Sequence, residues 1–238
     1  MPLKLIACMR ASGIERLFFS YQSRHNFRRL NFLRPSGIAM SELTPEQRRL
    51  HGEANLDEFF RTVEPELKAH VVSLPQRISR MNARRDIKLK EVLNTADQIM
   101  DHAQKFAACR MGCGHCCYVS VPITDFEAKW IGKKINTAPA PIKRSIRRNL
   151  TKVSGKTPCI FLKDNSCSIY EFRPLTCRIH MNFDIDNYWC LHENVNRPEA
   201  AIPKPTITAL TTAYNQLGEG LKPIVADIRD FFPNGKSA

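Results

Sequence analysis

The chain has 238 residues, of which 43% are hydrophobic and 25% charged, values that are ordinary for a globular protein. This length allows one sizeable hydrophobic core, or a core with a small satellite. No apolar run approaches the roughly 18 residues that a membrane span needs, so we expect no transmembrane helix and no membrane partner.

The first 39 residues are the most basic part of a chain whose formal net charge is +13. They hold seven Lys or Arg side chains against a single acid, Glu15, and they show no clean hydrophobic periodicity. We interpret residues 1–39 as a basic, disordered N-terminal extension, with Met40 as an alternative start of the native protein. A basic arm for an anionic partner is the competing interpretation.

Residues 40–108 are predicted to form a helical N-terminal region. Thr44 is a suitable N-cap, Pro45 suits a first helical turn and Gln47 completes a capping box. Apolar residues follow at helical spacing, and the pattern predicts two or three helices over residues 44–108.

Helical patterns return after the central cysteines. Thr124, with Glu127 three residues later, indicates another capping box, and residues 141–155 are predicted to form a further helix. Five basic residues between positions 143 and 152 are most simply a solvated helix face. No aromatic side chains are interleaved with them, so nucleic acid is only a weakly supported partner.

The stretch CIFLKDNSCSIYEF, residues 159–172, places a polar turn between two short apolar runs, which predicts a hairpin carrying Cys159 and Cys167. Two closing helices are expected in residues 193–238, over 204–221 and 222–232, packing on the same unit. The predicted fold class is therefore mainly α, with a small irregular or β-hairpin cysteine-rich centre at residues 109–192.

Eight of the nine cysteines gather in that centre, four of them in the nine residues CRMGCGHCC. A disulfide framework is disfavoured because the count is odd and no credible signal peptide is present, which indicates a cytoplasmic, reducing compartment. The vicinal pair cannot crosslink to itself without a strained ring. The eight cysteines are Cys109, Cys113, Cys116, Cys117, Cys159, Cys167, Cys177 and Cys190.

Metal ligation explains this density. Thiolates are soft ligands that suit Zn²⁺ and iron–sulfur clusters, and short spacings let one turn present several sulfurs to a common centre. Gly112 and Gly114 flank Cys113 and permit a tight backbone there. A four-thiolate zinc site carries negative charge, so nearby Arg110, Arg173 and Arg178 are expected to offset it.

Read together, the two cysteine blocks resemble the CxxCxxCC cysteine-cluster family, a zinc- or iron-chelating domain. The resemblance covers about residues 105–192 and rests on GCGHCC and on CIFLKDNSCSIYEFRPLTCR, which repeats the family's Cys-x-Ile-Tyr-x-x-Arg-Pro-x-x-Cys-Arg pattern. Three residues separate Cys109 from Cys113, where the family's name implies two. The pattern Cys-x3-Cys-x2-Cys, formed by Cys109, Cys113 and Cys116, also resembles the cluster-binding motif of radical S-adenosylmethionine enzymes. Those enzymes continue with alternating strands and helices, and no such pattern follows here.

The resemblance implies a zinc or iron–sulfur cofactor held by the eight cysteines, with Cys109 and Cys190 the positions left open. In the second block, Tyr170 is expected to pack its ring against the site, and Arg173 to donate to a thiolate or to stabilise the turn. Three histidines are each either an additional ligand or an ordinary polar residue: His115, His180 and His192.

Two classes of function remain open. One is a metal-binding module without catalysis, in which metal binding contributes to folding. The other is an iron–sulfur enzyme or redox protein, and a distant similarity to the cysteine-cluster region of flagellin lysine N-methylases makes methyl transfer the analogy. No Ser/His/Asp set, paired carboxylates or phosphate-binding loop assigns a catalytic residue, and no protein partner is indicated.

Overall fold

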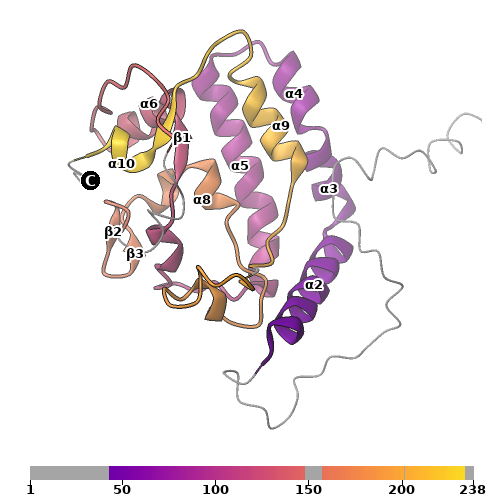
Figure 1. The fold of residues 1–238 in the computed structure, drawn as a ribbon. Helices are drawn as coiled ribbons and strands as arrows, with labels where there is room; N and C mark the ends of the chain where they lie inside the picture. The colour runs from indigo at the N-terminus through magenta and orange to yellow at the C-terminus, as the bar shows by residue number, and fades with distance from the viewer. Residues whose placement is uncertain (1–42, 148–156, 201, 234–238) are drawn as a thin grey trace, which may run out of the picture.

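The computed structural model describes residues 43–147, 157–200 and 202–233, so the predicted extension at 1–39 lies outside the described residues (Figure 1). The α-helices are α2 (Pro45–Thr62), α3 (Pro65–Val72), α4 (Leu74–Arg80), α5 (Arg85–Ala103), α6 (Asp125–Lys134), α8 (Leu175–Arg178), α9 (Thr208–Gln216) and α10 (Ile228–Phe231). Short 3₁₀ helices are η2 (Gln104–Phe106), η3 (His115–Tyr118), η4 (Tyr170–Phe172) and η5 (Tyr188–Cys190). The strands are β1 (Pro122–Thr124), β2 (Leu162–Lys163), β3 (Ser166–Cys167) and β4 (Val225–Asp227). The fold is mainly α, as predicted.

The capping signal at the start of α2 is confirmed. The Thr44 side chain accepts a hydrogen bond from the backbone N–H of Gln47, whose side chain accepts one from Thr44 N–H at 2.8 Å. Further along α2, a Cβ atom on Gly52 would lie 2.2 Å from the Pro203 ring, so glycine allows the C-terminal segment to cross the helix closely. Where two or three helices were predicted over residues 44–108, the structure has four α-helices, α2 to α5.

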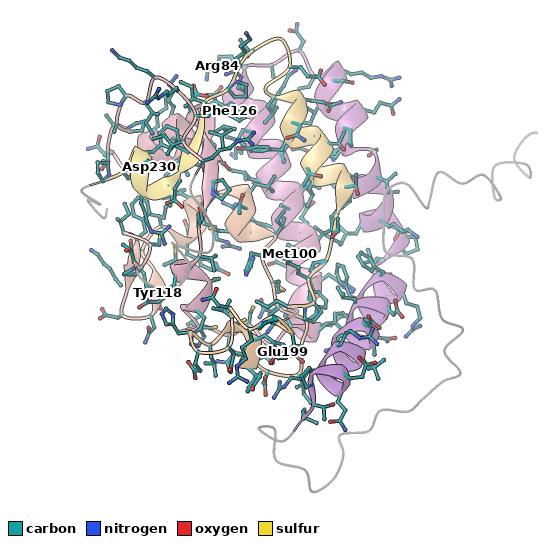
Figure 2. The ribbon with its side chains drawn as sticks, viewed as in Figure 1. Arg84, Met100, Tyr118, Phe126, Glu199 and Asp230 are labelled. Carbon is teal, nitrogen blue, oxygen red and sulfur yellow. The ribbon has the colours of Figure 1, made fainter. Side chains whose placement is uncertain are left out.

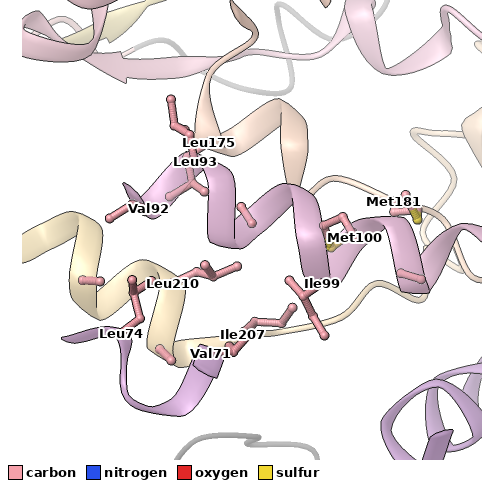
Figure 3. Packing of buried hydrophobic residues seen from close by; sticks show 14 of the residues in the cluster. Val71, Leu74, Val92, Leu93, Ile99, Met100, Leu175, Met181, Ile207 and Leu210 are labelled. Atoms are coloured by element: carbon pink, nitrogen blue, oxygen red, sulfur yellow. The ribbon is translucent and has the colours of Figure 1, made fainter. Parts of the chain in front are cut away.

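Helix α5 lies at the centre of the larger core and packs against α4, α8 and α9 (Figure 1). Figure 3 shows Ile99 of α5 and Leu210 of α9 within the same interior. The Ile87 side chain, near the start of α5, is exposed. The buried apolar stripe of α5 is Leu89, Val92, Leu93, Ala96, Ile99, Met100 and Ala103, at the spacing of one helix face.

A second, smaller core surrounds the two-stranded antiparallel pairing of β1 with β4, in which Ile123 lies opposite Ala226. The predicted helix over residues 222–232 is wrong in its first half, because residues 225–227 pair with β1 as a strand. The tertiary pairing with β1 overrides the local helical pattern there. Only Ile228–Phe231 are helical. Asp227 is the N-cap of this helix: its side chain accepts a hydrogen bond from the backbone of Asp230, and the Asp230 side chain accepts one from the backbone of Asp227.

Helix α6 also begins at its predicted cap, since Thr124 accepts a hydrogen bond from the backbone N–H of Glu127 at 3.3 Å. The Glu127 carboxylate does not return to the cap. It accepts hydrogen bonds from Leu175 N–H at 2.9 Å and from the Tyr214 hydroxyl at 2.6 Å. This buried carboxylate therefore joins α6 to α8 and α9, and burial raises the pKa of Glu127.

The predicted helix at 141–155 does not form in residues 141–147, and residues 148–156 lie outside the described part. Backbone groups in and next to residues 141–147 bond to the C-terminal segment instead. Ala140 N–H donates to the Phe231 carbonyl, and Ile146 N–H donates to the Val225 carbonyl. Among the helices that the structure describes, none combines the length and the apolar character required to cross a membrane.

Candidate metal centre

The first cysteine block follows α5 and η2 and turns tightly. Gly112 has a φ of +81°, a left-handed conformation that favours glycine, and it lies between Cys109 and Cys113. Cys113 N–H donates to the Arg110 carbonyl at 3.0 Å, closing the turn. Cys116 and Cys117 then lie in η3, which ends at Tyr118, labelled in Figure 2.

The second block is the predicted hairpin. Leu162 of β2 pairs with Cys167 of β3, and Asp164 and Asn165 adopt positive φ values of 47° and 57° in the turn between them. Asn and Asp tolerate this conformation better than most residues, so the polar turn chemistry was a valid signal.

The fold brings the two blocks together through backbone hydrogen bonds. Cys159 N–H donates to the Cys117 carbonyl at 2.7 Å, which joins the start of the hairpin to the end of η3. Four cysteines lie against the smaller core: Cys117, Cys159, Cys167 and Cys177. Cys109 instead packs against the larger core, so these five cysteines divide between the two cores.

Asn182 links a first-block cysteine to a cysteine from the end of the centre. Its backbone N–H donates to Cys109 Sγ at 3.4 Å, and its side-chain amide donates to Cys190 Sγ at 3.4 Å. The side chain is only 2% exposed, and its carbonyl oxygen accepts from Asp184 N–H. Hydrogen bonds from amide groups to sulfur are the kind of contact that orients metal-binding thiolates.

Burial raises the pKa of most of these thiols. It does so for Cys109, Cys159 and Cys167, and it raises the pKa of Cys190 to about 12. A nearby positive charge such as a metal ion would relieve this penalty, because it stabilises the thiolate that burial disfavours.

The vicinal pair behaves differently. Cys117 hydrogen-bonds to the neighbouring sulfur of Cys116 and lowers the pKa of Cys116 to about 7, while the same contact raises the pKa of Cys117. Cys116 is also exposed, whereas the other described cysteines are buried or half-buried. Within the vicinal pair, Cys116 therefore ionises before Cys117.

Comparison with known families bears on the same segment. Residues 108–197 match the CxxCxxCC family model. The family's description reads "Putative zinc- or iron-chelating domain". Comparison of the whole chain with curated proteins and with solved structures gives no match.

The match supports metal chelation by the CxxCxxCC segment, residues 108–197, and leaves open the choice between zinc and iron. The donor chemistry of this segment fits such a metal, because its eight cysteines are all free thiols. As arranged in the described residues, no three His, Cys, Asp or Glu side chains meet closely enough to hold a metal ion. Coordination therefore requires the thiols to draw closer than this structure places them.

The arginines of the second block stabilise its backbone. Buried Arg178 donates to the carbonyls of Arg173 and Glu171 and forms an ion pair with Asp97. Burial raises the pKa of the Cys167 thiol, and the charge of Arg173 partly offsets this effect.

The Tyr170 side chain is 60% exposed, and the Arg173 guanidinium stacks 3.7 Å from the centre of its ring. Tyr170 thus packs on this arginine at the protein surface.

The three histidines lie in different environments. His115 Nε2 is 3.2 Å from the Asn187 side-chain amide, which ties the first-block turn to η5. The ring of His192 packs edge-on against Tyr118, and burial lowers the pKa of His180. Their roles as ligands stay predictions.

Sequence reasoning missed Arg229, which holds the backbone around the vicinal cysteines. Its guanidinium donates to the carbonyls of Cys117 at 2.7 Å and Val119 at 3.3 Å, and it pairs with Asp227 at 2.9 Å. No local motif signals this role, because Arg229 is 112 residues from Cys117 in the chain. Asn182 was missed for a similar reason, because its contact with Cys109 spans 73 residues of the chain.

Proposed function

We propose that this protein chelates a thiophilic metal, zinc or iron in an iron–sulfur cluster, through the cysteine thiolates of the CxxCxxCC segment. The observation that carries the proposal is the junction of the two cysteine blocks. Cys117 and Cys159 share a backbone hydrogen bond, and Asn182 donates to the sulfurs of Cys109 and Cys190. Cys109 and Cys190, which are 81 residues apart in the chain, thereby face the same asparagine.

The chain's own residues supply three things to such a metal. The cysteines supply soft donors whose ionisation a metal cation would favour. Asn182 orients the sulfurs of Cys109 and Cys190 through its hydrogen bonds to them. Arg229 holds the backbone at Cys117 by donating a hydrogen bond to its carbonyl. When bound, zinc would supply structural crosslinking of the segment, whereas an iron–sulfur cluster would supply electron transfer.

Elemental analysis of anaerobically purified protein tests the proposal. Bound zinc predicts a colourless protein with stoichiometric metal. An iron–sulfur cluster predicts a brown protein with acid-labile sulfide. Protein that carries neither metal after purification, and binds neither Zn²⁺ nor iron with sulfide on reconstitution, contradicts the proposal.

Single substitutions identify the ligands. Cys116→Ser and Cys177→Ser are each expected to lower the bound metal. Met111→Ser is a matched control in the same loop, because the Met111 side chain is fully exposed between Cys109 and Cys113. Full metal content in both cysteine variants, equal to that of the control, would remove these positions from the ligand set.

A further inference from the structure

A pocket of about 240 Å³ lies where the start of α5 meets α6, lined by side chains from residues 84–89 and 126–133. Figure 2 labels Arg84 and Phe126, one from each side of it. We propose that this pocket binds a small phosphate ester that carries one flat ring. The inference goes beyond metal chelation, because no cysteine lines the pocket.

One part of the pocket lining is apolar and firmly packed. Leu89 and Phe126 are 1% and 8% exposed, and they belong to the larger core. Trp130 is half-buried and packs against both cores, with its ring edge-on to that of Phe172. A flat ring that enters the pocket therefore meets aromatic side chains whose positions the core fixes.

The charged part of the lining is strongly cationic. Four Lys or Arg side chains face one carboxylate, which gives the lining residues a net formal charge of +3. Asp86, the single acid, pairs with Arg84 at 3.1 Å, and Lys129 pairs with Asp125 at 3.2 Å. The four cations are all exposed: Arg84, Arg85, Lys129 and Lys133. This charge favours an anionic ligand.

Two of these cations are available to bind an anion. Within the part of the chain that the structure describes, neither Arg85 nor Lys133 has a carboxylate partner. The Arg85 guanidinium lies 5.3 Å from the centre of the Phe126 ring, so its charge is placed beside the apolar part of the pocket. A phosphate ester carries a charge of about −1.5 to −2 at pH 7, which two cations match. Guanidinium and ammonium groups both bind phosphate oxygens.

The size of the pocket limits the ligand. Its volume of about 240 Å³ lies below the roughly 300–1,000 Å³ of pockets that hold drug-sized molecules. A dinucleotide is therefore too large, whereas one ring with one phosphate is of suitable size. The phosphate is expected beside Arg85 and Lys133, with the ring against Trp130.

Phenyl phosphate is the probe that tests the proposal, with the tryptophan fluorescence of the full chain as the readout. The chain has two tryptophans, and Trp189 is 2% exposed and outside the pocket lining, so a change in fluorescence reports on Trp130. We expect a saturable change that weakens as salt concentration rises. Trp130→Phe should remove the fluorescence change while calorimetry still detects binding.

Three further probes separate the parts of the ligand. Inorganic phosphate, phenol and benzoate should each bind more weakly than phenyl phosphate. Inorganic phosphate of equal affinity would contradict the contribution of the ring. Benzoate of equal affinity would contradict the preference for phosphate, because it carries the same ring with a single negative charge.

Substitutions locate the site. Arg85→Gln and Lys133→Gln are each expected to weaken phenyl phosphate binding about tenfold or more, because each removes a charged hydrogen-bond donor. Lys90→Gln is the matched control, since it removes the same charge from an exposed position of α5 outside the pocket. Absence of saturable binding to the wild type, or equal weakening in the control, would overturn the proposal. The metal content of these variants is expected to stay that of the wild type, so failure here leaves the chelating function untouched.

Discussion

Replacing Arg229 by methionine removes a buried charge and keeps a side chain of similar length. Arg229 is 7% exposed, and its guanidinium donates to four backbone carbonyls, those of residues 117, 119, 157 and 158. It also contacts both carboxylate oxygens of Asp227, at 2.9 and 3.2 Å. The substitution leaves the carboxylate and the carbonyls without this donor.

The expected loss of stability follows from the uncompensated carboxylate. Breaking a buried ion pair by removing one partner costs about 3–5 kcal/mol. Asp227 retains hydrogen bonds from Ser120 and from Val121 N–H, which limits the loss to this range. We expect Arg229→Met to lower the free energy of unfolding by about 4 kcal/mol.

Urea denaturation followed by tryptophan fluorescence, at pH 7 and fixed free metal concentration, measures this loss. Arg84→Met is the matched control, because the Arg84 side chain is 80% exposed in its pair with Asp86. Its expected effect is below about 0.5 kcal/mol. Adding Asp227→Asn to Arg229→Met should recover part of the stability, because the unpaired charge is then absent.

A loss below about 1 kcal/mol in Arg229→Met would refute this reasoning. It would mean that water or a local rearrangement satisfies the carbonyls and Asp227 as well as the guanidinium does. Lost metal content at unchanged stability would instead assign Arg229 to positioning Cys117 rather than to holding the fold.

Three further outcomes are expected. Asn182→Ala removes the amide donor to Cys190 and should weaken metal binding by about 10- to 100-fold in a chelator competition assay; unchanged affinity would separate Asn182 from the site. Burial raises the pKa of Glu127, so the folded chain loses stability as pH rises above 4.5. Thermal scans from pH 4.5 to 7 should show a smaller loss of stability in Glu127→Gln than in the wild type, and the same pH dependence in both proteins would contradict this expectation. Burial acts to raise the pKa of Asp227, but its hydrogen bonds lower the pKa overall, so the stability that this carboxylate contributes is lost as pH falls below 3.8. In Asp227→Asn, the free energy of unfolding should therefore fall less steeply with decreasing pH than in the wild type, and an equal slope would count against this role.

Local signals in the sequence predicted the elements that depend on near neighbours. The Thr44 cap and the polar turn of the hairpin are formed by residues within a few positions of one another, and both are present. The apolar stripe of α5 is equally local, because a helix places every third or fourth side chain on one face.

Two predicted helices are absent over part of their length, at residues 141–147 and 225–227, where the backbone bonds to distant segments instead. Residues 225–227 pair with β1, more than 100 residues earlier in the chain, and residues 140 and 146 bond to the C-terminal segment. Helical periodicity contains no information about such partners, because strand pairing depends on which edge the fold exposes.

The cysteine density, the thiolate donor set and the soft metals that suit it follow from the amino-acid sequence alone. The arrangement of the thiols depends on the tertiary structure: which cysteines lie against which core, and which amide faces Cys109 and Cys190. The physical reason is that a buried polar group must find its partner in the folded interior. For Asn182 and Arg229 those partners lie up to 73 and 112 residues away in the chain, at positions that only the packing of the two cores brings together.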